Sequence, residues 1–93
     1  MARQFEVEFV TEHEYVVRAD SGAQVVESWF HIEPEVLRQL GVGDADESRV
    51  VERTAEFLAE RQDVEDFPNL VHIEDVVATY DDYPERLRRS LGV

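Results

Sequence analysis

The segment that most constrains the fold is residues 44–62, which carries the clearest helical periodicity in the chain. Its apolar side chains recur at steps of three and four residues, which places them on one face of an α-helix. The residues of this face are Val50, Val51, Thr54, Ala55, Phe57 and Leu58. Asp44 and, three residues later, Glu47 predict a box-like N-terminal cap. We therefore expect a long amphipathic helix with a structural role.

The residues before this helix alternate between apolar and polar side chains, which is the period of a half-buried β-strand. Residues 5–10 fit this pattern, and the polar stretch 11–14 fits a hairpin connection. Residues 15–19 are predicted to form a second strand because they are rich in β-forming side chains. Residues 23–32 fit a strand or a helix, and the strand is favoured because β-branched and aromatic residues dominate. As a strand, this segment has Val26, Ser28, Phe30 and Ile32 on one face and Val25, Glu27, Trp29 and His31 on the other.

Three shorter helices are predicted around the long one. Residues 34–40 begin with a proline, which suits the first position of a helix, and Gly41 suits its C-terminal cap. Residues 74–80 form a second amphipathic segment, and a proline begins a third over 84–91. Residues 69–73 fit either a brief extended segment or the start of the helix that follows them.

The order of these elements, strands first and helices later, predicts the α+β class. We expect a three-stranded antiparallel β-meander in the N-terminal part, packed against three to four helices from the C-terminal part. A length of 93 residues is close to the commonest domain size, so residues 1–93 are expected to form a single domain.

The chain is strongly acidic, because 22 acidic side chains against nine arginines and no lysine give a net charge of −13. This charge disfavours binding to nucleic acids and anionic membranes, and it favours a basic partner. Arginine without lysine is typical of a high-GC coding bias, and acidity is also typical of halophile proteins. No apolar run could span a membrane and the N-terminus lacks the apolar core of a signal peptide, so a cytoplasmic location is expected.

Residues that could carry chemistry are few, and their spacing selects no reaction. The absence of cysteine excludes disulfides, thiol nucleophiles and zinc–thiolate sites. There is no glycine-rich phosphate loop with a lysine, and no serine lies in a nucleophile elbow. We therefore predict that the protein is not an enzyme and needs no cofactor.

The alternative function is a small carboxylate-based metal-binding protein or enzyme. Two polar clusters could serve it: His72 with Glu74 and Asp75, and the pair Asp81 and Asp82. Neither cluster has the ligand spacing of a known metal class, and carboxylate neighbours are expected by chance in so acidic a chain. A simpler interpretation of the aspartate pair is that it caps the helix that follows. No catalytic, cofactor or metal ligand is therefore assigned.

A protein-interaction module is the function that the sequence favours, with Trp29 as its anchor. In a strand, Trp29 and Phe30 face opposite sides, so either the sheet is covered on both sides or one aromatic ring is exposed. An exposed tryptophan beside other apolar groups commonly marks an interface. Trp29, Val25 and Tyr15 are expected to form this patch, and a helix crossing back over Trp29 is the alternative.

The partner of such a module is either a basic protein or a second copy of the chain. Three arginines near the C-terminus would serve the second alternative, because they could meet the acidic body of another subunit. These arginines are Arg86, Arg88 and Arg89.

Overall fold

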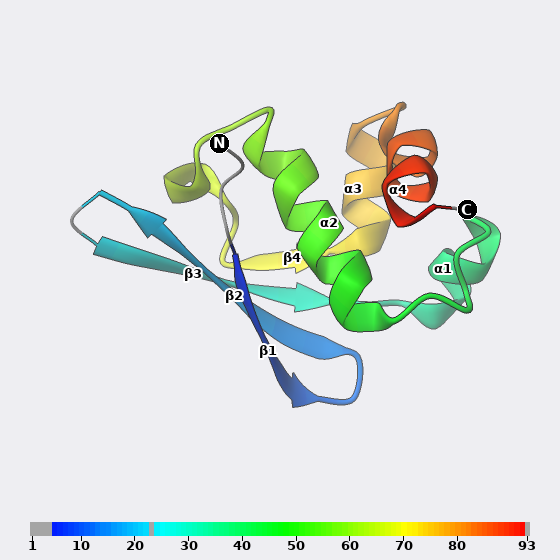
Figure 1. Ribbon diagram of the computed structural model, residues 1–93, viewed down its shortest axis with the longest axis horizontal. Helices are drawn as coiled ribbons and strands as arrows, with labels where there is room; N and C mark the ends of the chain where they lie inside the picture. The colour runs from blue at the N-terminus through cyan, green and yellow to red at the C-terminus, as the bar shows by residue number, and fades with distance from the viewer. Residues whose placement is uncertain (1–4, 23, 93) are drawn as a thin grey trace.

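The computed structural model describes residues 5–22 and 24–92, which form a four-stranded sheet with helices gathered on one side of it (Figure 1). The elements, in chain order, are β1 (Glu6–Thr11), β2 (Glu14–Ser21), β3 (Gln24–His31), α1 (Pro34–Gln39), α2 (Glu47–Ala59), the 3₁₀ helix η1 (Val64–Asp66), β4 (Leu70–His72), α3 (Ile73–Thr79) and α4 (Tyr83–Leu91). The predicted α+β class is confirmed.

The first three strands form the antiparallel meander that the alternating pattern predicts. The ambiguous segment is a strand, as favoured, although its first predicted residue, Ala23, lies outside the described residues. Gly22 in the β2–β3 turn has a φ of 65°, a left-handed conformation that glycine adopts without strain. His13 in the β1–β2 turn has the same φ of 65°, which is uncommon for a residue with a side chain.

A fourth strand corrects the prediction of a three-stranded sheet. β4 has three residues and pairs in parallel with β3, so that Trp29 lies opposite Leu70 and His31 lies opposite His72. Parallel neighbours require a crossover connection, which here consists of α1, α2 and η1. Of the two alternatives that the sequence left open for residues 69–73, the extended segment is the one that forms.

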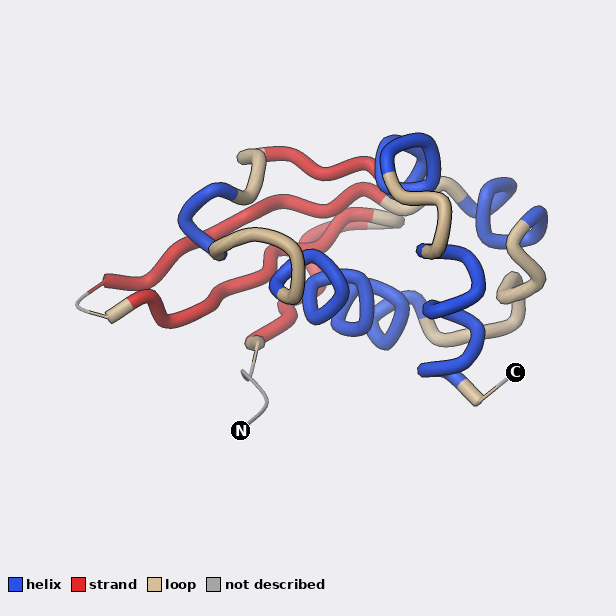
Figure 2. Tube along the Cα trace, turned by 90° about the horizontal axis from the view of Figure 1, so that it is seen from above, coloured by secondary structure: helices blue, strands red, loops and turns tan. Residues whose placement is uncertain are grey.

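The two faces of the sheet have different surroundings, because α2, α3 and α4 all lie on the same side of it (Figure 1). Figure 2 shows the four strands side by side, with α2 running along the β1 side of the sheet. We call the side toward the helices the covered face and the opposite side the open face. The buried strand residues of the covered face are Tyr15, Val17, Ala19, Ser28, Phe30 and Val71.

The long helix is shorter than predicted and starts three residues later, at Glu47. Asp46, rather than Asp44, is the N-cap, and its side chain accepts a hydrogen bond from the Ser48 backbone N–H at 2.9 Å. The Glu47 carboxylate does not close a capping box. It contacts His13 Nδ1 at 2.8 Å and accepts a hydrogen bond from the Tyr15 hydroxyl at 3.1 Å, which ties the first hairpin to α2.

The interior of the helical layer contains one polar pair. The Tyr83 ring is fully buried, and its hydroxyl lies 2.7 Å from Thr54 Oγ1. Since Thr54 donates its own hydroxyl proton to the Val50 carbonyl, Tyr83 is the donor in this pair. Burial raises the pKa of Tyr83 to about 12. This buried hydrogen bond joins the start of α4 to the middle of α2.

Candidate functional site

The open face of the sheet is organised in rungs of cross-strand neighbours, because residues directly opposite one another on adjacent strands share a face. We name three of them. The arginine rung consists of Glu6, Arg18 and Glu27. The apolar rung consists of Glu8, Val16, Trp29 and Leu70. The histidine rung consists of Glu14, His31 and His72.

The apolar rung exposes two large side chains to solvent. Trp29 is 43% exposed and Leu70 is 52% exposed. Val16 is buried, because it lies on β2, which has β1 on one side and β3 on the other. Within the described part of the chain no helix covers Trp29, so the alternative in which a helix crosses back over it is wrong. Val25 lies on the same face of β3 and is 59% exposed. The predicted placement of Val25 and Trp29 on one exposed face is thus confirmed.

Tyr15 does not belong to this patch, and its expected place beside Trp29 is wrong. Tyr15 lies opposite Phe30 on the covered face and is only 7% exposed. Val16, the next residue, is the one opposite Trp29. A shift of one residue in register moves every side chain of a strand to the other face, and the hairpin register was not available from the pattern of β2 alone.

The arginine rung contains one cation among several carboxylates. Arg18 donates from Nη1 to Glu8 at 2.6 Å and from Nε to Glu27 at 2.7 Å, and its Nη1 lies 3.7 Å from Glu6. Hydrogen bonds to Glu8 and Glu27 raise the pKa of Arg18. Because one positive charge faces three negative ones, this end of the open face is net acidic.

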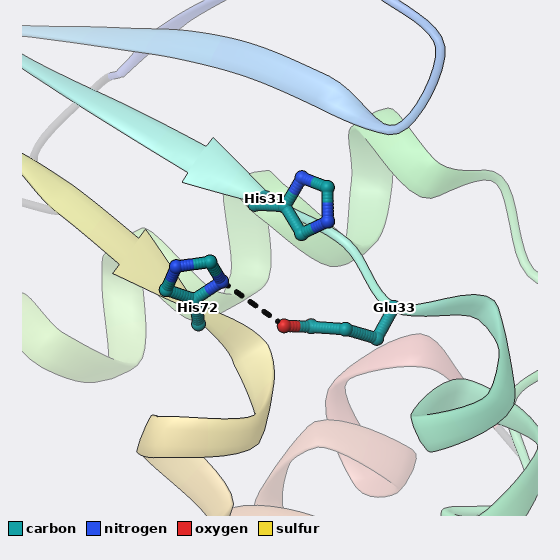
Figure 3. A group of neighbouring side chains, drawn as sticks. All are labelled: His31, Glu33 and His72. Atoms are coloured by element: carbon teal, nitrogen blue, oxygen red, sulfur yellow. Dashed lines mark hydrogen bonds and ion pairs between the residues drawn. The ribbon is translucent and has the colours of Figure 1, made fainter.

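The histidine rung brings together residues that are distant in the sequence. His31 and His72 end β3 and β4, and their ring centroids are 5.3 Å apart. Glu33 follows two residues after His31, and its Oε1 lies 3.1 Å from His72 Nδ1 (Figure 3). The ligand-type atoms of these three residues all lie within 4.8 Å of one another. On the other side of His31, Glu14 Oε1 lies 3.8 Å from Nδ1.

The structure groups His72 with different partners from those that the sequence suggested. Glu74 and Asp75 are exposed in the first turn of α3. Across residues 5–22 and 24–92, the only group of three potential metal ligands is His31, Glu33 and His72. Sequence reasoning missed His31 and Glu33. Their signal was a His-x-Glu spacing at the end of a strand, which acquires meaning only once β4 is paired beside it.

Asp81 and Asp82 are both exposed, and Asp82 has a structural role. The Asp82 carboxylate forms ion pairs with Arg61 and, at 3.9 Å, with Arg86. Asp82 occupies the N-cap position of α4, but its side chain makes no capping hydrogen bond. The predicted capping role is therefore wrong for the Asp82 side chain, which instead connects α4 to the end of α2.

The three C-terminal arginines lie on α4, in the helical layer, and do not adjoin Trp29. Arg86 donates to Glu60 at 2.9 Å, Arg89 donates to Glu85 at 2.8 Å, and Arg88 donates to the Leu40 carbonyl at 3.0 Å. Each therefore has a partner within its own chain. The structure does not bring them together with Val25 and Trp29 into one surface.

A shallow groove of about 520 Å³ joins the apolar and histidine rungs on the open face. Its lining residues are Glu14, Trp29, His31, Asn69, Leu70 and His72.

Comparisons with protein-family models, with curated proteins and with solved structures found no match for this chain. In the described part of the chain, no helix combines the length and apolar character needed to cross a bilayer.

Proposed function

We propose that this protein is a non-catalytic interaction module that binds a basic protein partner on the open face of its sheet. The observation that carries the proposal is the exposed apolar rung, in which Trp29 and Leu70 stand side by side without a covering helix. Tryptophan is the residue type most enriched among the side chains that dominate binding energy in protein interfaces.

The shape of the surface supports this use. The groove beside Trp29 and Leu70 offers a concave apolar contact with polar groups at its edge, which is the usual anatomy of a small interface. An apolar side chain of the partner would bury the faces of both residues at once. Truncating such an anchor typically costs about 2 kcal/mol or more of binding free energy.

The charge around the groove selects the chemistry of the partner. Glu8 belongs to the apolar rung itself, Glu14 lines the groove, and the arginine rung beyond is net acidic. These carboxylates attract and orient a basic surface. A second copy of the chain is disfavoured, since each copy carries a net charge of −13 and the C-terminal arginines are engaged within their own chain.

The proposal can be tested by site-specific photo-crosslinking in a lysate of the native host. A photoreactive amino acid is placed at Val25 or Leu70 on the open face, and at the exposed Ala78 on α3 as the matched control position. We expect one basic protein to crosslink at Val25 and Leu70 but not at Ala78. High salt should abolish this product, because it screens the acidic rim.

Trp29→Ala, combined with the Leu70 crosslinker, provides the second arm. Loss of the product in this variant would support the anchor role of the indole. The proposal is wrong if the same products form at Ala78 as at the open face, if the Trp29 variant crosslinks as well as the parent, or if only dimers of the chain itself appear.

A further inference from the structure

The end of the β3–β4 pair holds three ligand-type side chains, of which His31 and His72 also line the groove. His31 and His72 are direct partners in the parallel register, so their side chains leave the sheet on the same face. Glu33 then turns back toward them just before α1 begins. Figure 3 shows the three side chains, which come from β3, from the segment after it and from the end of β4, pointing toward one another.

We propose that His31, Glu33 and His72 form a binding site for a divalent transition-metal ion, with Zn²⁺ as the leading candidate. Two imidazoles and one carboxylate are a common protein ligand set for zinc sites that keep one coordination position open. Imidazole also suits copper, nickel and iron, whereas calcium and magnesium prefer oxygen-only surroundings.

The distances fit this assignment. Zinc–nitrogen and zinc–oxygen bonds are about 2.0–2.2 Å, so two ligand atoms of a tetrahedral site lie roughly 3.4 Å apart. Glu33 Oε1 and His72 Nδ1 are already 3.1 Å apart, and all three ligand atoms lie within 4.8 Å of one another. Small rotations of half-buried side chains are therefore sufficient to complete the site.

A second observation at Glu33 points to a cation. Its Oε2 is inaccessible to solvent and has no hydrogen-bond partner among the described residues. A buried carboxylate oxygen without a donor is costly, and a metal ion bound by Glu33 would compensate its charge. Glu14 adds a supporting carboxylate, because it lies beside Nδ1 of His31 and leaves Nε2 of that ring for the ion.

The sole tryptophan provides a direct readout of binding. Trp29 lies two residues before His31 on the same face of β3, and both residues line the same groove. Co²⁺ bound by the histidines should quench the fluorescence of Trp29 and show the visible absorption of tetrahedral cobalt. Zn²⁺ should reverse both signals by displacement. Titration calorimetry of the full chain with Zn²⁺ should give one site per chain.

The variants His31→Ala, His72→Ala and Glu33→Gln locate the site. Each should weaken Zn²⁺ binding about tenfold or more, since even the loss of a supporting group around a metal typically costs roughly 10–100-fold. His13→Ala is the matched control, because His13 also contacts two carboxylates, Glu12 and Glu47, but lies outside the cluster. This control should bind Zn²⁺ as tightly as the parent.

The titrations are run at about 0.15 M salt, where the Debye length is only about 8 Å and diffuse binding to the acidic surface is screened. Circular dichroism confirms that each variant is folded, and a given Zn²⁺ concentration should raise the melting temperature of the parent more than that of Glu33→Gln. The proposal is overturned if Zn²⁺ shows no saturable binding, if the cluster variants bind as tightly as the parent, or if His13→Ala loses as much affinity as they do.

Discussion

The covered and open faces of the same sheet differ in how their side chains are stabilised. On the covered face, Phe30 and Val17 are buried to 1–2% exposure against the helices. On the open face, the adjacent residue Trp29 remains 43% exposed beside Val16 and Leu70, and the rungs on either side carry carboxylates, an arginine and two histidines. The covered face therefore supplies stability through packing, whereas the open face leaves large apolar side chains accessible to solvent.

Phe30 and Trp29 are adjacent positions on β3, but they differ strongly in burial. Phe30 and Trp29 have nearly the same backbone environment, so substituting each in turn compares the two faces with little change in secondary structure.

The largest effect is expected for Phe30→Ala. Removing a fully buried aromatic ring leaves a cavity, which typically costs about 3–5 kcal/mol of unfolding free energy. Urea denaturation followed by circular dichroism measures this loss. A cost below about 1 kcal/mol would mean that the covered face is not the packed core described above.

The next effect is the response to alkaline pH. The pKa values of Tyr83 and Tyr15 are each raised to about 12 from an ordinary value of 10.0, by burial and, for Tyr15, also by its hydrogen bond to Glu47. The unfolded chain loses these protons first, so the unfolding free energy should fall from pH 10 to pH 12. For the fully buried Tyr83, a shift of two units corresponds to at most about 2.7 kcal/mol.

Tyr83→Phe isolates the buried member of this pair. The variant lacks the ionisable hydroxyl, so its unfolding free energy should fall about half as much over that pH range as the parent's. At neutral pH it should lose about 1 kcal/mol with its hydrogen bond to Thr54. An unchanged alkaline response in chemical denaturation would show that Tyr83 ionises normally.

Trp29→Ala should change stability much less than Phe30→Ala does. The indole is only about half buried, so its removal should cost roughly 1–2 kcal/mol. The same urea experiment measures both variants. If the two costs were equal, Trp29 would be part of the core and the contrast between the faces would fail.

The smallest effect is expected for Arg18→Met, which removes the cation of the arginine rung but keeps an unbranched apolar stem. Exposed ion pairs contribute little, so the melting temperature should fall slightly at low salt and be unchanged at high salt. A large loss that persists in high salt would indicate that Arg18 stabilises the open face by packing.

Much of the fold could be predicted from the sequence, because the patterns of apolar residues that indicate strands and helices lie within short segments of the chain. Alternation predicted the first meander strand, β-forming side chains predicted the other two, and the strand assignment placed Trp29 and Phe30 on opposite faces. The helical stripe from Val50 to Leu58 is buried as expected. The start of α2 was less accessible, because Asp44 and Asp46 can both cap a helix, and only the backbone at Asp46 decides between them.

The candidate site was less predictable, because it depends on contacts between distant segments. Three residues are too few to show a period, so the pairing of β4 with β3 was not visible, and neither was the meeting of His31 with His72. His72 was singled out for its sequence neighbours Glu74 and Asp75, but its spatial neighbours come from the end of β3. When a crossover connection separates the ligands in the sequence, the ligand set can be recognised only after the strand pairing is known.

The parallel pairing of β4 also has a consequence for how the chain folds. β1, β2 and β3 are joined by short turns and can pair locally, whereas β4 reaches its place only after the intervening crossover has closed. Glu33 and His72 are 39 positions apart in the chain, so their contact forms late and opens early. In native-state hydrogen exchange, the β4 amides should therefore exchange through a partial opening that leaves the meander protected.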